Sequence, residues 1–141
     1  MWIVFALLAA LSAAIVVVLS KAGIKNLDSS LAFAIQSILI VLVSWSVVFL
    51  QGKHTELQKI EPRTWIFLGV AGIITAVSSL LTFRALKLGD APVVSPVERL
   101  SLVFAIIFAA LFLKERVTWQ VAAGAALMAA GAIVIAVAKK A

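Results

Sequence analysis

Residues 91–113 read APVVSPVERLSLVFAIIFAALFL, an apolar stretch with one charged pair, Glu98-Arg99, near its start. The uncharged part, residues 100–113, is only about 21 Å long as a helix, at roughly 1.5 Å per residue. Because a hydrocarbon core is about 30 Å thick, a spanning helix must begin earlier, near Ala91. Glu98 and Arg99 then lie about 11–14 Å along that helix, where ionisable groups usually face protein, a water-filled cavity or each other. The stretch predicts a membrane protein whose chemistry is in this segment.

The composition excludes several classes of protein. Of the 141 residues, 65% are hydrophobic and 13% are charged, and a soluble domain of this size cannot bury so much apolar surface. The absence of cysteine excludes disulfides and thiolate metal sites, and the single histidine, His54, excludes a histidine cluster. We therefore expect no metal and no cofactor. The net charge of +6 is spread over segment ends, which favours a lipid bilayer over nucleic acid as the partner.

Five apolar segments are long enough to cross a bilayer, and none alternates like a barrel strand. The first has no basic residue before Lys21 and a longer apolar run than a secretory signal, so we interpret it as a span. The links are too short for another domain, so we expect residues 1–141 to form a single domain. The predicted fold class is an all-α integral membrane protein, a five-transmembrane-helix bundle. The predicted spans are about 2–20, 31–50, 65–86, 91–113 and 118–138.

The cations that flank these segments give little information about orientation. Five lysines and arginines lie on the face that carries the N-terminus, and five lie on the other, or seven if Arg84 and Arg99 are counted. The positive-inside rule needs a clear bias, which is missing here. This balance favours insertion in both orientations and assembly as an antiparallel pair. A single orientation set by weaker signals stays open.

Candidate functional residues cluster at the start of the fourth span. Pro96 lacks a backbone donor and loosens the turn that holds Glu98, and such interruptions beside ionisable groups recur in transporter sites. Glu98 could exchange a proton or meet a cation, or it could be locked to Arg99 or Arg84 as a structural ion pair. Arg99 could bind a carboxylate or phosphate. Ser95, near Glu98, has no base at hand, so we expect no enzyme.

Weakly polar or basic positions on the other spans have two interpretations each. Helix faces with small, weakly polar side chains usually allow close packing between helices. The alternative interpretation is that they line a substrate path. Cations at span ends usually extend to the interface, and their alternative is to bind substrate. These positions are Gln36 on the second span, Thr75, Ser79 and Thr82 on the third, and Lys21 and Arg84 at span ends.

The last span is rich in alanine and places Gly124 and Gly131 one heptad apart. Small residues on one stripe allow two backbones to approach closely, so this stripe is a candidate dimer face. Packing within one chain is the alternative interpretation.

Three pieces of sequence form a recognisable pattern: FRALKLGDA at 83–91, VSPVERLS at 94–101 and FLKER at 112–116, followed by Gly124 and Gly131. The pattern resembles the EamA domain of the drug/metabolite transporter superfamily. The small five-span bacterial and archaeal members resemble this chain over nearly its whole length, including KAG at 21–23.

The resemblance implies a carrier in the cytoplasmic (inner) membrane that works by alternating access. Longer relatives hold two such domains in inverted orientation, so a single-domain member is expected to pair with a second copy. The Gly124–Gly131 spacing is similar to the dimerising heptad of the small multidrug resistance proteins. Two departures leave the substrate class open: Glu98 stands where an aspartate is more familiar, and Gln36 stands where an arginine is expected.

We therefore expect a secondary transporter, an exporter of a small polar or amphipathic metabolite, that acts as a homodimer. Glu98 would be the coupling or gating acid, with Arg99 as its partner or as a substrate ligand. Pro96 would supply the local break, and Thr75, Ser79 and Thr82 would line the path. The alternative is a non-transporting scaffold subunit in which Glu98-Arg99 is a structural ion pair.

Overall fold

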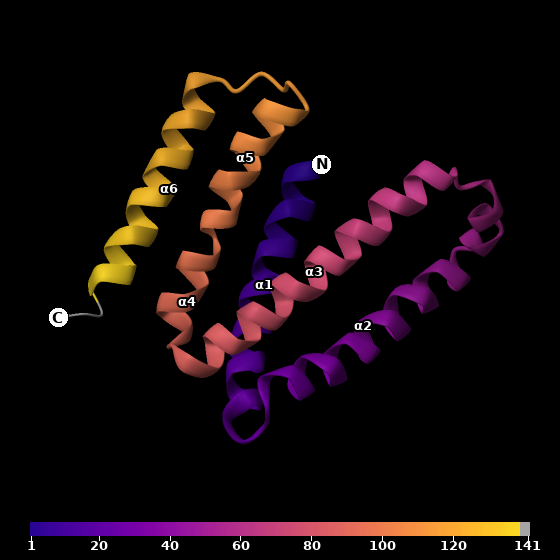
Figure 1. Cartoon of the computed structure of the whole chain (residues 1–141), viewed down its shortest axis with the longest axis horizontal. Coiled ribbons are helices and arrows are strands. Elements are labelled where there is room, and N and C mark those ends of the chain that lie inside the picture. The colour runs from indigo at the N-terminus through magenta and orange to yellow at the C-terminus, as the bar shows by residue number, and fades with distance from the viewer. Residues whose placement is uncertain (139–141) are drawn as a thin grey trace. The chain divides into compact units, whose positions relative to one another are not determined.

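The computed structural model describes residues 1–138, and this range is almost entirely helical, without a strand (Figure 1). Within it, five stretches of helix are long and apolar enough to cross a membrane, so the predicted fold class is confirmed. Lys139 and Lys140, which follow the last span, lie outside the described residues. The elements are α1 (Trp2–Gly23), η1 (Ile24–Asn26), α2 (Ser29–Leu50), η2 (Lys53–Lys59), α3 (Pro62–Leu88), α4 (Ala91–Glu98), α5 (Leu100–Phe112) and α6 (Trp119–Ala138), where η denotes a 3₁₀ helix.

The chain divides into two compact units. Unit 1 comprises Met1–Val18 and Leu88–Ala141, and unit 2 comprises Leu19–Lys87. Most large apolar side chains of the spans are exposed, as expected for helices that lipid surrounds. Among the described residues, the buried apolar side chains are Ile24, Phe83 and Leu86 in unit 2, and Ala125 and Ala132 in unit 1.

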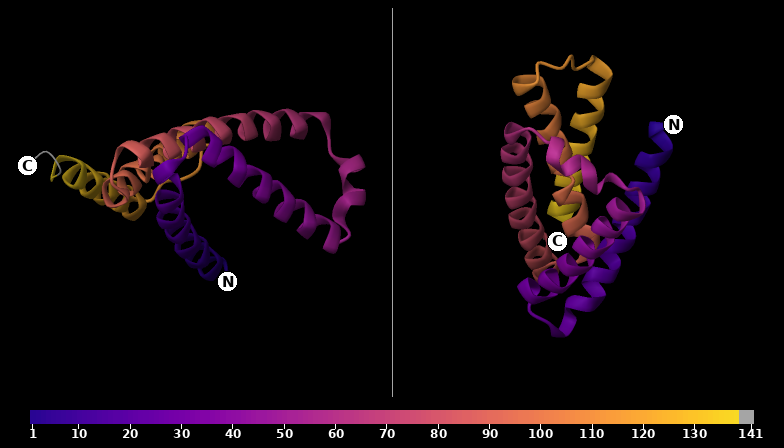
Figure 2. Two further views of the ribbon diagram at one scale, coloured as in Figure 1. Left: turned by 90° about the horizontal axis from the view of Figure 1, so that it is seen from below. Right: turned by 90° about the vertical axis from the view of Figure 1, so that its right-hand side faces the viewer.

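In unit 1, α6 packs along both α4 and α5, and it runs antiparallel beside α5 (Figures 1 and 2). The two buried residues of α6, Ala125 and Ala132, are 8% and 6% exposed and lie one heptad apart on one face. Their small side chains let the helix backbones approach closely. Residues 113–118 join α5 to α6 without regular structure, and Lys114 takes the left-handed conformation, with φ 55°.

The fourth span is divided into α4 and α5 at Arg99. Pro96 lies inside α4 and has no N–H for the carbonyl of Pro92, which removes one helical hydrogen bond. The Arg99 N–H donates to the Ser95 carbonyl at 3.2 Å, whereas the Leu102 N–H reaches back only three residues, to the Arg99 carbonyl at 3.0 Å. This second bond spans three residues instead of the four of an α-helix, which marks a local change of helical geometry at Arg99.

In unit 2, α2 and α3 approach each other near the α1–α2 turn and spread apart toward η2 (Figure 2). Their close ends meet at Phe33 and Phe83, whose ring centroids are 5.6 Å apart. Ile24 and Leu86, only 2% and 1% exposed, complete this small core. The packed part of unit 2 is therefore the end that carries the α1–α2 turn.

Two helices of unit 2 begin earlier than the sequence predicts, at Ser29 and at Pro62. Asp28 caps α2, because its carboxylate accepts from the backbone N–H groups of Ser30 at 2.9 Å and Leu31 at 3.3 Å. These two bonds, with a smaller contribution from the charge of Lys87, lower the pKa of the Asp28 carboxyl. Pro62 opens α3 because a missing N–H costs nothing in a first helical turn.

Candidate functional site

Four of the predicted site residues occupy the last turn of α4 and the break that follows it. Glu98 is the last residue of α4 and is partly buried, and Arg99, at the interruption, is exposed. Ser95 and Pro96 lie three and two residues before Glu98 and are partly buried. The turn thus combines an acid, a guanidinium, a hydroxyl and a proline-weakened backbone within five residues. An arrangement of this kind can change its local geometry at low cost next to a group that can ionise.

Two of the predicted polar residues of unit 2, Lys21 and Gln36, lie at the end that holds the α1–α2 turn. The Lys21 ammonium donates to the Leu86 carbonyl at 2.6 Å, across 65 positions of sequence. The Ser20 hydroxyl lies 3.5 Å from the Gln36 side-chain oxygen, at the long limit of a hydrogen bond. Ser20 and Gln36 help to line a largely apolar cavity of about 270 Å³, together with Leu19, Gly23, Ile24, Leu27, Ala32, Ile35 and Phe83.

The small polar residues of α3 differ in their surroundings. The Thr75 hydroxyl donates to the Ala71 carbonyl of its own helix at 2.8 Å, and the side chain is exposed. Ser79 and Thr82 are partly buried, and Arg84 is exposed. Thr75 has therefore used its one donor within α3, although its oxygen can still accept a hydrogen bond.

The glycine pair of the predicted dimer face, Gly124 and Gly131, lies in the middle of α6. Each is exposed, and each directly precedes one of the buried alanines, Ala125 and Ala132. A methyl group added at either glycine would meet nothing within 4 Å. Nothing in the described part of the chain packs closely against this glycine stripe.

The predicted site residues fall into both units. Unit 1 contains Ser95, Pro96, Glu98, Arg99, Gly124 and Gly131. Unit 2 contains Lys21, Gln36, Thr75, Ser79, Thr82 and Arg84.

The sequence interpretation did not identify Lys25 and Lys87 as candidates. The Lys87 ammonium donates to the Leu27 carbonyl at 2.6 Å, which is the counterpart of the bond from Lys21 to Leu86. The sequence did contain a signal for Lys87, because a lysine in the last turn of a helix can bond free carbonyls and stabilise the helix end, and Lys87 lies in the last turn of α3. Lys25 follows Lys21 by four residues. Simple extension to the interface was the favoured interpretation of Lys21, and in the structure its ammonium donates to a backbone carbonyl of α3.

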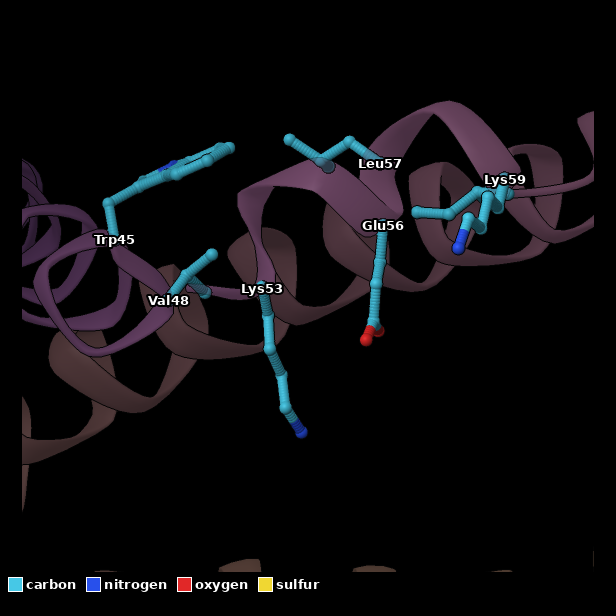
Figure 3. Close-up of a pocket in the computed structure, with 7 residues that line it drawn as sticks. Trp45, Val48, Lys53, Glu56, Leu57 and Lys59 are labelled. Carbon is cyan, nitrogen blue, oxygen red and sulfur yellow. The ribbon is translucent and has the colours of Figure 1, made fainter. Parts of the chain in front are cut away.

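A second cavity of unit 2, of about 560 Å³, lies where α2 meets η2 (Figure 3). Trp45 and Leu57 lie on one side of the ribbon, and the side chains of Lys53 and Glu56 extend from the opposite side (Figure 3). A tryptophan beside charged residues is typical of the boundary between membrane and water. Among residues 1–138, no three His, Asp or Glu side chains gather into a group that could hold a metal ion.

Comparisons with known proteins agree with this architecture. Residues 1–137 match the sequence model of the EamA-like transporter family. The chain is also 40% identical, over 136 residues, to a protein from Sinorhizobium sp. named an uncharacterized transporter in the cobO 3′ region. The alignment covers 96% of each of the two chains. No solved structure matches the chain.

Proposed function

This chain belongs to the EamA-like transporter family of membrane proteins, and from that premise we propose that it exports a small polar or amphipathic metabolite by alternating access. The membership points to a transporter rather than to an enzyme. The five apolar stretches make it a multi-pass membrane protein, and the cytoplasmic membrane of a bacterium or archaeon is the proposed location. The proposed working form is a homodimer.

The interruption of the fourth span at Arg99 is the observation that carries this proposal. A carrier must change conformation while it keeps the backbone of its helices satisfied in lipid. The break between α4 and α5 supplies a place for such a change, and it lies beside Glu98, an acid within a span. Ionisable residues within spans are costly, so each indicates a function until shown otherwise.

The residues then take the following proposed roles. Glu98 is the coupling or gating acid, which binds and releases a proton or a cation during the cycle. Arg99 is its partner or a ligand of an anionic group on the substrate, because its planar donors fit a carboxylate or phosphate. Pro96 weakens the turn, and Ser95 adds a hydroxyl beside Glu98. The proposed path and binding residues on the other unit are Lys21, Gln36, Thr75, Ser79, Thr82 and Arg84.

Access of water to position 98 tests the transport role directly. The chain has no cysteine, so Glu98→Cys introduces a single thiol. We expect a water-soluble maleimide to label this thiol in membranes, because a carrier must expose the position to water in some state. The matched control is Ile107→Cys inside α5, an apolar position that should resist the reagent because water is excluded from the hydrocarbon core. Equal resistance at both positions would favour the scaffold alternative.

The homodimer is supported by two independent features. The exposed Gly124–Gly131 stripe on α6 leaves room for a closely packed helix from a second copy. The balanced flanking charges allow the two copies to insert in opposite orientations.

Paired topology reporters on the C-terminus test the antiparallel form. One reporter is active only in the cytoplasm and the other only outside it. We expect signal from both fusions, since neither face of the chain has a decisive excess of cations. Adding two lysines beside Lys114 should shift the signal strongly toward one reporter. Activity of a single reporter in the unaltered chain would rule out dual orientation.

A further inference from the structure

We propose that unit 2 contains a binding site for a phosphate group, formed by the ammonium groups of Lys21, Lys25 and Lys87. These three lysines, with Ile24 and Leu86, line a cavity of about 230 Å³ at the end that carries the α1–α2 turn. Nothing in the proposed transport cycle uses Lys25 or Lys87. Lys21 is shared with the proposed path, whereas Lys25 and Lys87 belong to the phosphate site alone.

Two of the lysines are held in place by backbone carbonyls. Lys21 donates to the Leu86 carbonyl and Lys87 to the Leu27 carbonyl, each at 2.6 Å. These bonds fix two flexible side chains at the cavity wall, which lowers the entropy lost when an anion binds. An ammonium has three N–H donors, so the bond from Lys87 to one carbonyl leaves donors for a ligand. Lys25 is exposed and adds a third cation at the same cavity.

The charge balance at this cavity favours an anion. The Leu86 carbonyl belongs to the last turn of α3, where the helix dipole is negative, and the Lys21 bond offsets that partial charge. The charge of Lys87 also acts on Asp28, where it makes a small contribution to the lowered pKa of that carboxyl. The Asp28 carboxylate caps α2 by accepting from Ser30 and Leu31. Three of the five residues that line the cavity are lysines, and their positive charges favour an anionic ligand.

The floor of the cavity distinguishes it from a set of scattered surface lysines. Ile24 and Leu86, which also line the cavity, are almost completely buried, at 2% and 1% exposed, so part of the cavity wall is aliphatic. A lower local dielectric strengthens the attraction between these cations and an oxyanion. Basic cavities at the ends of spanning helices are suited to phosphate-bearing lipid headgroups, and a soluble phosphate ester offers the same chemistry.

Thermal unfolding of the detergent-solubilised full chain, followed by tryptophan fluorescence, tests the site. The probes are dihexanoyl phosphatidylglycerol, glycerol 1-phosphate and, as a probe without phosphate, dihexanoylglycerol. We expect a phosphate-bearing probe to raise the unfolding midpoint of the unaltered chain, because a ligand of the folded state stabilises it. A response to the lipid alone identifies a headgroup, and a response to both identifies the phosphate group itself.

The decisive variant is Lys25→Gln, because Lys25 makes neither of the two carbonyl bonds and its loss should leave the midpoint without probe unchanged. We expect the dissociation constant of the phosphate-bearing probe to rise about fivefold in this variant, the effect of one lysine near an anionic surface. Lys25→Arg should restore the affinity. Lys53→Gln, on η2, makes the same change in net charge and should bind as the unaltered chain does. Equal phosphate responses in Lys25→Gln and Lys53→Gln, or a response as large to dihexanoylglycerol, would overturn the proposal.

Discussion

We expect Glu98→Gln to reduce transport to the background of empty liposomes, or to uncouple it from its driving ion, without impairing membrane insertion. Glutamine has nearly the same shape and can still make hydrogen bonds, but it can neither ionise nor carry a proton. The substitution leaves Pro96 and the helix break at Arg99 unchanged. A loss of flux would therefore result from the loss of the ionisable group of Glu98, and not from a change in the geometry of α4. Flux in liposomes across a range of pH, with insertion measured in parallel, checks the result.

The matched control for this experiment is Glu115→Gln, which makes the same chemical change in the exposed link between α5 and α6. We expect it to transport like the unaltered chain. Normal transport by Glu98→Gln at every pH would remove the coupling role from Glu98. Residual transport that no longer responds to pH would instead identify Glu98 as the coupling group.

The largest effect on stability is expected from Ala132→Leu. Ala132 is 6% exposed, on the face that α6 turns toward α4 and α5. A leucine there must push α6 away from its neighbours, and overpacking of this kind costs about 1–3 kcal/mol. We expect a lower unfolding midpoint in detergent, measured by tryptophan fluorescence. Reduced flux should accompany it, because α6 supports the helix that carries Glu98.

Ala130→Leu provides the comparison, since Ala130 is exposed on the same helix. It adds the same apolar volume without a neighbour to displace, and leucine remains a good helix former. Its midpoint should match that of the unaltered chain. If both variants unfold alike, the buried alanine face does not hold α6 against α4 and α5.

The sequence predicted five helices long and apolar enough to cross a membrane, because lipid imposes a simple requirement that composition alone reveals. The ends were less accurate. Apolarity begins at Leu31 and Trp65, whereas α2 and α3 begin at Ser29 and Pro62. Helix starts depend on the Asp28 cap and on the tolerance for proline in a first turn, and these polar signals lie outside an apolar window.

The residues of the fourth span could be singled out because an acid and a proline are conspicuous among apolar neighbours. The lysine bonds of unit 2 could not be found in this way. Their acceptors are the carbonyls of Leu27 and Leu86, and every residue type supplies a carbonyl. Only the fold brings positions 21 and 86 together, so Lys21 looked like an ordinary interfacial cation.

The number of spans has a consequence for how such a chain can evolve. Five crossings between Trp2 and Ala138 are an odd number, so the first and last spans of this stretch leave their outer ends in opposite compartments. A tandem duplication that adds no further crossing would start its second copy from the other compartment. The second copy would then be inverted relative to the first, and one gene would encode both members of an antiparallel couple. An even-numbered ancestor would need an additional crossing to reach the same arrangement.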